Sequence, residues 1–220
     1  MRIQISGARL IDPASGLDEV SDIFIEQGKI VAIGQMPRGF STERLIDAQG
    51  LIAAPGLVDI NAALREPGYG RKGTIASETR AAAAGGVTSL CSTPNTKPVL
   101  DTPAVAELIL DQARDTGSCR VFPLGALTQG LAGEQLAELM TLRDAGCIAF
   151  TNGLNAFSSN RALRHALEYA ASFDLTVIFH PQDRDLAEGG IAHEGAVATF
   201  RGLAGVPETA ETVALSRDLL

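Results

Sequence analysis

The sequence predicts an α/β protein that forms part of a parallel (β/α) barrel of the TIM type, with a small β module in front of it. Two observations carry this prediction. From residue 51 onward, short apolar runs typical of buried strands alternate with segments whose apolar residues recur at helical spacing. This strand–helix unit repeats about every 28–30 residues, which favours a parallel barrel over an irregular α/β mixture.

The first 53 residues differ from the rest, because they contain short alternating runs separated by glycine turns and no helical pattern. We therefore expect residues 1–53 to form a small, sandwich-like β module. The strands expected there are residues 3–5 and 9–11 around one glycine turn, residues 22–26 and 30–33 around a second, and residues 45–50.

Residues 54–220 are expected to form the N-terminal part of the barrel domain. Helical faces are indicated by Val105, Leu108 and Ile109 and by the apolar positions of residues 160–171, and Pro103 and Pro207 suit a first helical turn. The expected strands are residues 57–60, 87–92, 120–126, 147–151 and 175–179.

Five strands are fewer than the eight that a closed barrel requires. An open five-stranded sheet leaves two edges free to pair with other chains. We therefore interpret the chain as a fragment or truncated product of a longer protein, truncated after about five βα units. An open five-stranded fold is the alternative.

Composition excludes several classes of partner. The net charge is −8 and the calculated isoelectric point about 4.9, without a basic run, which argues against nucleic acid and anionic membranes. No apolar stretch approaches the roughly 20 residues of a membrane span, and the first residues alternate like a strand. A cytoplasmic protein is expected.

Cys91, Cys119 and Cys147 recur at equal spacing, without a CxxC pair or a Cys/His cluster. This pattern does not suit a zinc knot or a disulfide framework. We expect three reduced, buried cysteines at matching places in successive structural units.

Several strings together resemble dihydroorotases of the amidohydrolase superfamily, along essentially the whole chain. The most specific are Leu-Arg-Glu-Pro-Gly at residues 64–68 and Pro-Asn-Thr-Lys-Pro at residues 94–98, which are also similar to hydantoinases and allantoinases. Supporting strings are Pro-Gly-Leu-Val-Asp at residues 55–59, the alanine- and glycine-rich residues 81–88, residues 125–128 with 133–134, and His180 with Asp183.

The resemblance implies a barrel whose strand ends bind one or two catalytic metal ions, yet this chain departs from that pattern. The two histidines that end the first barrel strand in the family correspond to Asn61 and Ala63. The bridging carboxylate of many members corresponds to Asn152, and a carboxylated lysine is excluded because no lysine follows Lys97. Only His180 is retained, so we expect the family zinc to be absent.

Arg65 and Asn95 correspond to the side chains that hold the substrate carboxylate in the family, and an Arg fork suits a carboxylate. Two interpretations stay open. The pair still binds a small carboxylate, or it is vestigial and structural, with Arg65 paired to Glu66 or another nearby acid.

The resemblance is greatest to the non-catalytic dihydroorotase-like chain that associates with aspartate carbamoyltransferase in pyrimidine biosynthesis. It implies a pseudoenzyme that scaffolds or stabilises the transferase catalytic subunits in a hetero-oligomer. One alternative is an active cyclic amidohydrolase with an atypical metal site, and another is a sensor of carboxylate metabolites.

Overall fold

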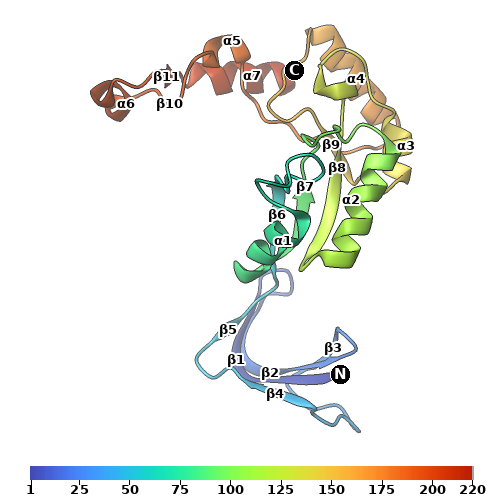
Figure 1. The fold of residues 1–220 in the computed structure, drawn as a ribbon. Helices are drawn as coiled ribbons and strands as arrows, with labels where there is room; N and C mark the ends of the chain where they lie inside the picture. The colour runs from blue at the N-terminus through green and yellow to red at the C-terminus, as the bar shows by residue number, and fades with distance from the viewer. Residues whose placement is uncertain (220) are drawn as a thin grey trace. The chain divides into compact units, whose positions relative to one another are not determined.

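The computed structural model describes residues 1–219, and the chain divides into two compact units, Met1–Gly56 and Leu57–Leu220. Among the residues described, no helix is both long and apolar enough to cross a bilayer. Figure 1 shows the helices and strands of both units, coloured along the chain from the N-terminus to the C-terminus.

The N-terminal unit is one five-stranded sheet, in the order β3-β2-β1-β4 with β5 also paired to β1. β1 pairs antiparallel with β2 and parallel with β4 and β5, and β2 pairs antiparallel with β3. The strands are β1 (Arg2–Asp12), β2 (Leu17–Glu26), β3 (Lys29–Ile33), β4 (Arg44–Asp47) and β5 (Ile52–Ala53).

The prediction of two strands around a glycine turn at residues 3–11 is wrong. Both segments belong to β1, and the register shifts between Ile5 and Ala8. Gly7 lies in this bulge with a φ of 73°, and its N–H donates to Asp22 Oδ1 at 2.9 Å. A glycine at positive φ here bends one strand instead of ending it.

The C-terminal unit contains a four-stranded parallel sheet in the order β6-β7-β8-β9. A two-stranded parallel sheet of β10 (Ala192–His193) and β11 (Gly205–Val206) lies further along the chain. The larger sheet consists of β6 (Leu57–Ala62), β7 (Val87–Ser92), β8 (Arg120–Ala126) and β9 (Ala149–Thr151).

Helices alternate with these strands, as the sequence pattern predicts. α2 begins at Pro103, which confirms its place in the first turn, whereas Pro207 precedes its helix, which begins at Thr209. The helices are α1 (Ile75–Ala84), α2 (Pro103–Thr116), α3 (Leu139–Asp144), α4 (Asn160–Ser172), α5 (Arg184–Ala187), α6 (Ala196–Arg201) and α7 (Thr209–Leu219), with a short 3-10 turn η1 (Gln129–Leu131).

Two expected strands differ from the structure. Residue 147 does not belong to β9, because the Cys147 N–H donates to Leu142 O at the end of α3. The expected strand 175–179 is reduced to a single parallel bridge between Val177 and Phe150. Among the described residues, the only strand beside this segment is β9, which has three residues, so the pairing is limited to this one bridge.

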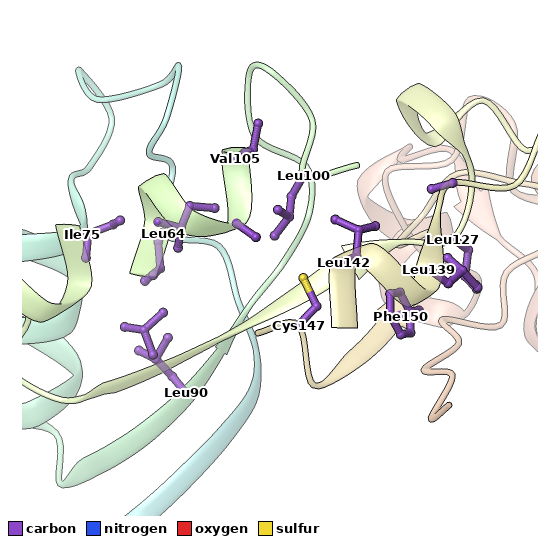
Figure 2. Packing of buried hydrophobic residues seen from close by; sticks show 14 residues of the cluster. Leu64, Ile75, Leu90, Leu100, Val105, Leu127, Leu139, Leu142, Cys147 and Phe150 are labelled. Carbon is purple, nitrogen blue, oxygen red and sulfur yellow. The ribbon is translucent and has the colours of Figure 1, made fainter. Parts of the chain in front are cut away.

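The main core lies between the parallel sheet and helices α1, α2 and α3. Figure 2 shows Leu90 of β7 and Phe150 of β9 with side chains from these helices, among them Ile75 and Leu142. Burial of such side chains contributes roughly 1.5–3 kcal/mol each. On the other face of the sheet, Cys91, Leu124 and Ala149 form a smaller cluster.

The three cysteines are free but do not occupy matching places. Cys91 lies in the smaller cluster, Cys147 is buried in the main core, and Cys119 is only half-buried beside it. Burial raises the pKa of the Cys147 thiol to about 12. The pKa of the Cys91 thiol is also raised, mainly by burial and to a smaller extent by the negative charge of Asp59.

The three cysteines of the native chain are therefore expected to react with a thiol reagent at different rates. At pH 8 only about one Cys147 side chain in ten thousand is a thiolate when its pKa is about 12, so half-buried Cys119 reacts first. Mass spectrometry after timed iodoacetamide treatment checks this, with the guanidinium-unfolded chain as control. Equal native rates at Cys147 and Cys119 would contradict the packing described.

Candidate functional site

The carboxyl ends of β6, β7, β8 and β9 lie along one edge of the parallel sheet, because the strands run in the same direction. In barrels of this architecture, functional side chains come from the loops that follow these ends. The six residues singled out from the sequence lie at the ends of these strands or in the segments that follow them, so this edge is the candidate site. They are Asn61, Ala63, Arg65, Asn95, Asn152 and His180.

The end of β6 offers no metal ligand at the two positions where the resemblance places histidines. Asn61 is exposed within β6, and its backbone N–H donates to Asp59 Oδ1 at 2.9 Å. Ala63 is half-buried immediately after the strand and has no donor atom in its side chain. An amide is a poor zinc ligand, and a methyl group is none.

The loops that carry Arg65 and Asn95 are joined to each other by main-chain hydrogen bonds. The Lys97 N–H donates to Pro67 O at 3.0 Å, and the Thr93 N–H donates to Ala62 O at 3.0 Å. A Cβ atom added to Gly68 would overlap the Lys97 backbone, so the approach of the loops requires glycine there. The structure therefore brings Arg65 and Asn95 onto neighbouring loops.

Arg65 is exposed and has a positive φ of 67°, a left-handed conformation that is uncommon for a non-glycine residue. The pairing with Glu66 that was left open does not occur. Glu66 Oε2 instead accepts the Ile75 N–H at 2.9 Å, at the first turn of α1. Within residues 1–219, the Arg65 guanidinium takes part in no ion pair or hydrogen bond.

Asn95 is exposed, and its Oδ1 accepts the Thr93 hydroxyl at 2.7 Å. This contact holds the amide beside the end of β7 and leaves its NH₂ group directed to no described partner. Arg65 and Asn95 together present hydrogen-bond donors on neighbouring loops, which is a suitable arrangement for a carboxylate.

Asn152, the residue at the bridging-carboxylate position, is buried, with 3% of its surface exposed. The Thr128 hydroxyl donates to Asn152 Oδ1 at 2.7 Å, and Asn152 Nδ2 donates to Asn155 O at 3.2 Å. Thr128 Oγ1 also accepts the Gly133 N–H at 2.9 Å. The amide thus stabilises two loops, and both of its polar atoms are already used.

His180 is exposed after the segment that bridges to β9. It lines a hollow of about 260 Å³ together with His193, Glu208 and Glu211, and a second, smaller hollow together with Asn152. The structure therefore brings His180 and Asn152 to one place. Throughout the described part of the chain, no three His, Cys, Asp or Glu side chains are grouped so that they could hold a metal ion.

Zinc needs three or four protein ligands, usually nitrogen, sulfur or carboxylate oxygen. The strand ends instead provide two amides, a methyl group and one imidazole at the positions that the family uses. These residues do not form a donor set that fits a catalytic zinc, and no reaction step through a metal follows from them.

Arg217 and Asp218 border the smaller hollow and were not identified from the sequence. Arg217 Nε donates to Asp218 Oδ1 at 2.9 Å, and the Asp218 side chain is only 6% exposed. Helical spacing from the buried Ala210 and Ala214 could have indicated the pair, because residues three and four positions further lie on the same face.

The parallel sheet with its helix layer and polar strand ends has the architecture of part of a (β/α) barrel. L-hydantoinase (dihydropyrimidinase) from Arthrobacter aurescens superposes with a TM-score of 0.78 at 23% identity, over 99% of this chain and 49% of that one. A D-hydantoinase superposes with a TM-score of 0.72 at 21% identity, over 100% and 49%. At such identities the likeness concerns the fold.

The chain belongs to the dihydro-orotase-like family, whose family model matches residues 50–220. It is 70% identical over 220 residues to a "Dihydroorotase-like protein" of Pseudomonas aeruginosa, covering 100% of this chain and 52% of the relative. It is 44% identical to a "Dihydroorotase" of Syntrophotalea carbinolica, with the same two coverages. The chain thus spans about half the length of the curated relatives it matches.

Replacement of Asn152 by aspartate is expected to destabilise the chain, even though it introduces the carboxylate that the resemblance to dihydroorotases implies at this position. A carboxylate still accepts from Thr128, but it places a second acceptor against Asn155 O, where the amide donates. The loss is about 1–3 kcal/mol in the free energy of unfolding. Urea unfolding checks it.

Asn155→Asp is the matched control, because it makes the same chemical change at the other side chain of this loop, where Nδ2 donates to Asn152 O. Since the Asn152 side chain is buried, its replacement should cost more. Stability of Asn152→Asp equal to or above that of the unsubstituted chain would show that the amide is not a structural requirement.

Proposed function

We propose that this chain is a non-catalytic member of its family, which serves as a dihydroorotase-like subunit of pyrimidine biosynthesis and stabilises aspartate carbamoyltransferase catalytic subunits in a hetero-oligomer. The single observation that carries the proposal is the end of β6, where Asn61 and Ala63 occupy the two histidine positions. Without those imidazoles the site lacks the ligands on which the family's chemistry depends.

The state of Asn152 adds support. In a working metal centre the residue at this position must be free to bind the metal, whereas here its amide holds the Thr128 and Asn155 loops together. A packing role for Asn152 in place of metal binding supports the proposal. Packing of this kind is what a scaffold must retain, since its function requires a folded surface and not a reactive group.

Zinc content and hydrolytic activity provide the first test. We expect the purified chain to bind substoichiometric zinc and to leave dihydroorotate unhydrolysed, because one imidazole is too few ligands. His180→Ala is the matched variant, since zinc that remains after this change is bound elsewhere. Stoichiometric zinc that His180→Ala removes, together with dihydroorotate turnover, would establish the atypical hydrolase instead.

Size-exclusion chromatography with light scattering, with and without the transferase of the same cell, tests the scaffold role. Co-elution in a fixed ratio is the expected result. Two separate peaks at working concentrations would contradict the proposed partnership, whatever the zinc analysis shows.

A second candidate, a sensor of carboxylate metabolites, is favoured by one specific observation. The exposed Arg65 guanidinium has no ion-pair partner among residues 1–219, although it lies at the edge where the family holds a substrate carboxylate. An unpaired Arg fork beside an amide suits a small dicarboxylate. This function requires no metal, so it is compatible with the substitutions at the strand ends.

Calorimetric titration with dihydroorotate and carbamoyl aspartate tests the sensor. If Arg65 binds the carboxylate, saturable heat is expected from the unsubstituted chain and from Arg71→Ala, and none from Arg65→Ala. Arg71 is the control because it is an exposed arginine in the same loop region. Absence of heat with both metabolites, or equal loss in both variants, would eliminate the sensor.

A further inference from the structure

Positive charge is concentrated in one stretch of this acidic chain. Residues 61–100 contain five basic and two acidic side chains, a net charge of +3. The other 180 residues contain 13 basic and 24 acidic side chains, a net charge of −11. Because lysine and arginine are almost never fully buried without a partner, a surplus of cations in one stretch is expected at the surface of the folded protein.

The structure gathers these cations on the two loops that follow β6 and β7. The Tyr69 N–H donates to Arg65 O and the Lys72 N–H donates to Tyr69 O, both at 2.8 Å, so the first loop folds back on itself. The Lys97 N–H donates to Pro67 O at 3.0 Å and joins the second loop to the first. We call the exposed residues Arg65, Tyr69, Arg71, Lys72 and Lys97 the cationic loop surface.

The two carboxylates of the same stretch are used at the start of α1. Glu66 Oε2 accepts the Ile75 N–H at 2.9 Å, and Glu78 Oε1 accepts the Ser77 hydroxyl at 3.1 Å. Neither carboxylate belongs to an ion pair among residues 1–219. The charge of the two loops therefore remains positive.

Tyr69 adds an aromatic side chain to this surface. It is 40% exposed, and Lys72 Nζ lies 5.8 Å from the centroid of its ring. Tyrosine and arginine are enriched where proteins bind other proteins. A small anion instead requires a hollow that surrounds it, and neither hollow described above is lined by these residues. The composition of the surface thus favours a protein partner.

We propose that the cationic loop surface docks an acidic protein surface, which belongs to the aspartate carbamoyltransferase catalytic subunit. The identity of this partner rests on the function proposed above. Opposite charge across an interface speeds association and fixes its orientation. Because the rest of the chain carries a net charge of −11, it repels an acidic partner, and the loops after β6 and β7 direct that partner to this edge of the sheet.

Surface plasmon resonance on immobilised transferase tests the proposal, with charge reversal at two exposed positions, Arg71→Glu and Lys97→Glu. Arg120→Glu is the matched control. Arg120 is also an exposed arginine, but it begins β8 and so lies at the opposite edge of the sheet from the two loops. Circular dichroism verifies that all three variants fold.

Each reversal on the cationic loop surface is expected to raise the dissociation constant about tenfold, mainly through slower association, whereas Arg120→Glu changes it less than about twofold. Salt provides an independent readout. The Debye length falls from about 10 Å at 0.1 M to about 3 Å at 1 M, so the affinity of the unsubstituted chain is expected to fall over this range.

The possible outcomes separate this inference from the proposed function. Equal, salt-independent affinity of the unsubstituted chain and both loop variants would overturn the docking surface and leave the partnership intact. Failure of the unsubstituted chain to bind transferase would overturn the partnership and the docking surface together. A single-stranded oligonucleotide that binds the unsubstituted chain but not Arg71→Glu would assign the surface to nucleic acid and overturn the protein partner.

Discussion

The burial of one face of the parallel sheet under helices α1, α2 and α3 is the constraint on which the candidate site depends. Parallel strands require crossover connections, and each crossover here places a helix on the same face. Leu90, Val121 and Phe150 fix the strands against that helix layer. Because all four strands then end at one edge, loops distant in sequence meet there.

At that edge, the buried amide of Asn152 holds two loops together. A carboxylate can face a cation, but it cannot donate to a carbonyl, whereas this amide accepts from Thr128 and donates to Asn155. The amide of Asn152 therefore anchors these loops, and a carboxylate at this position could make only one of the two contacts.

The sequence predicts much of the frame, for an identifiable physical reason. The strands expected at residues 87–92 and 120–126 coincide with β7 and β8, whose residues are mostly buried and lie between helical patterns. The helix expected at residues 160–171 is likewise confirmed as α4. The local sequence pattern is sufficient to predict a strand or helix where burial alone determines which of the two forms.

The sequence fails where contacts from distant residues decide the outcome. The Cys147 N–H bonds to Leu142 O at the end of α3, so this residue does not belong to β9. Gly7 lies at a bend within β1, where the local pattern predicts two separate strands. The partner of Asn152 lies 24 positions earlier in the chain, so no local signal reveals that its amide is already bonded. The side chains at Asn61 and Ala63, by contrast, can be read directly, and they carry most of the functional conclusion.

The measurement that tests the scaffold role most directly is the activity and half-life of dilute aspartate carbamoyltransferase as this chain is added. Both are expected to rise and to saturate at a fixed molar ratio, because binding to the folded form stabilises the transferase by mass action. A transferase that is fully active and equally long-lived at every concentration of the chain would contradict it.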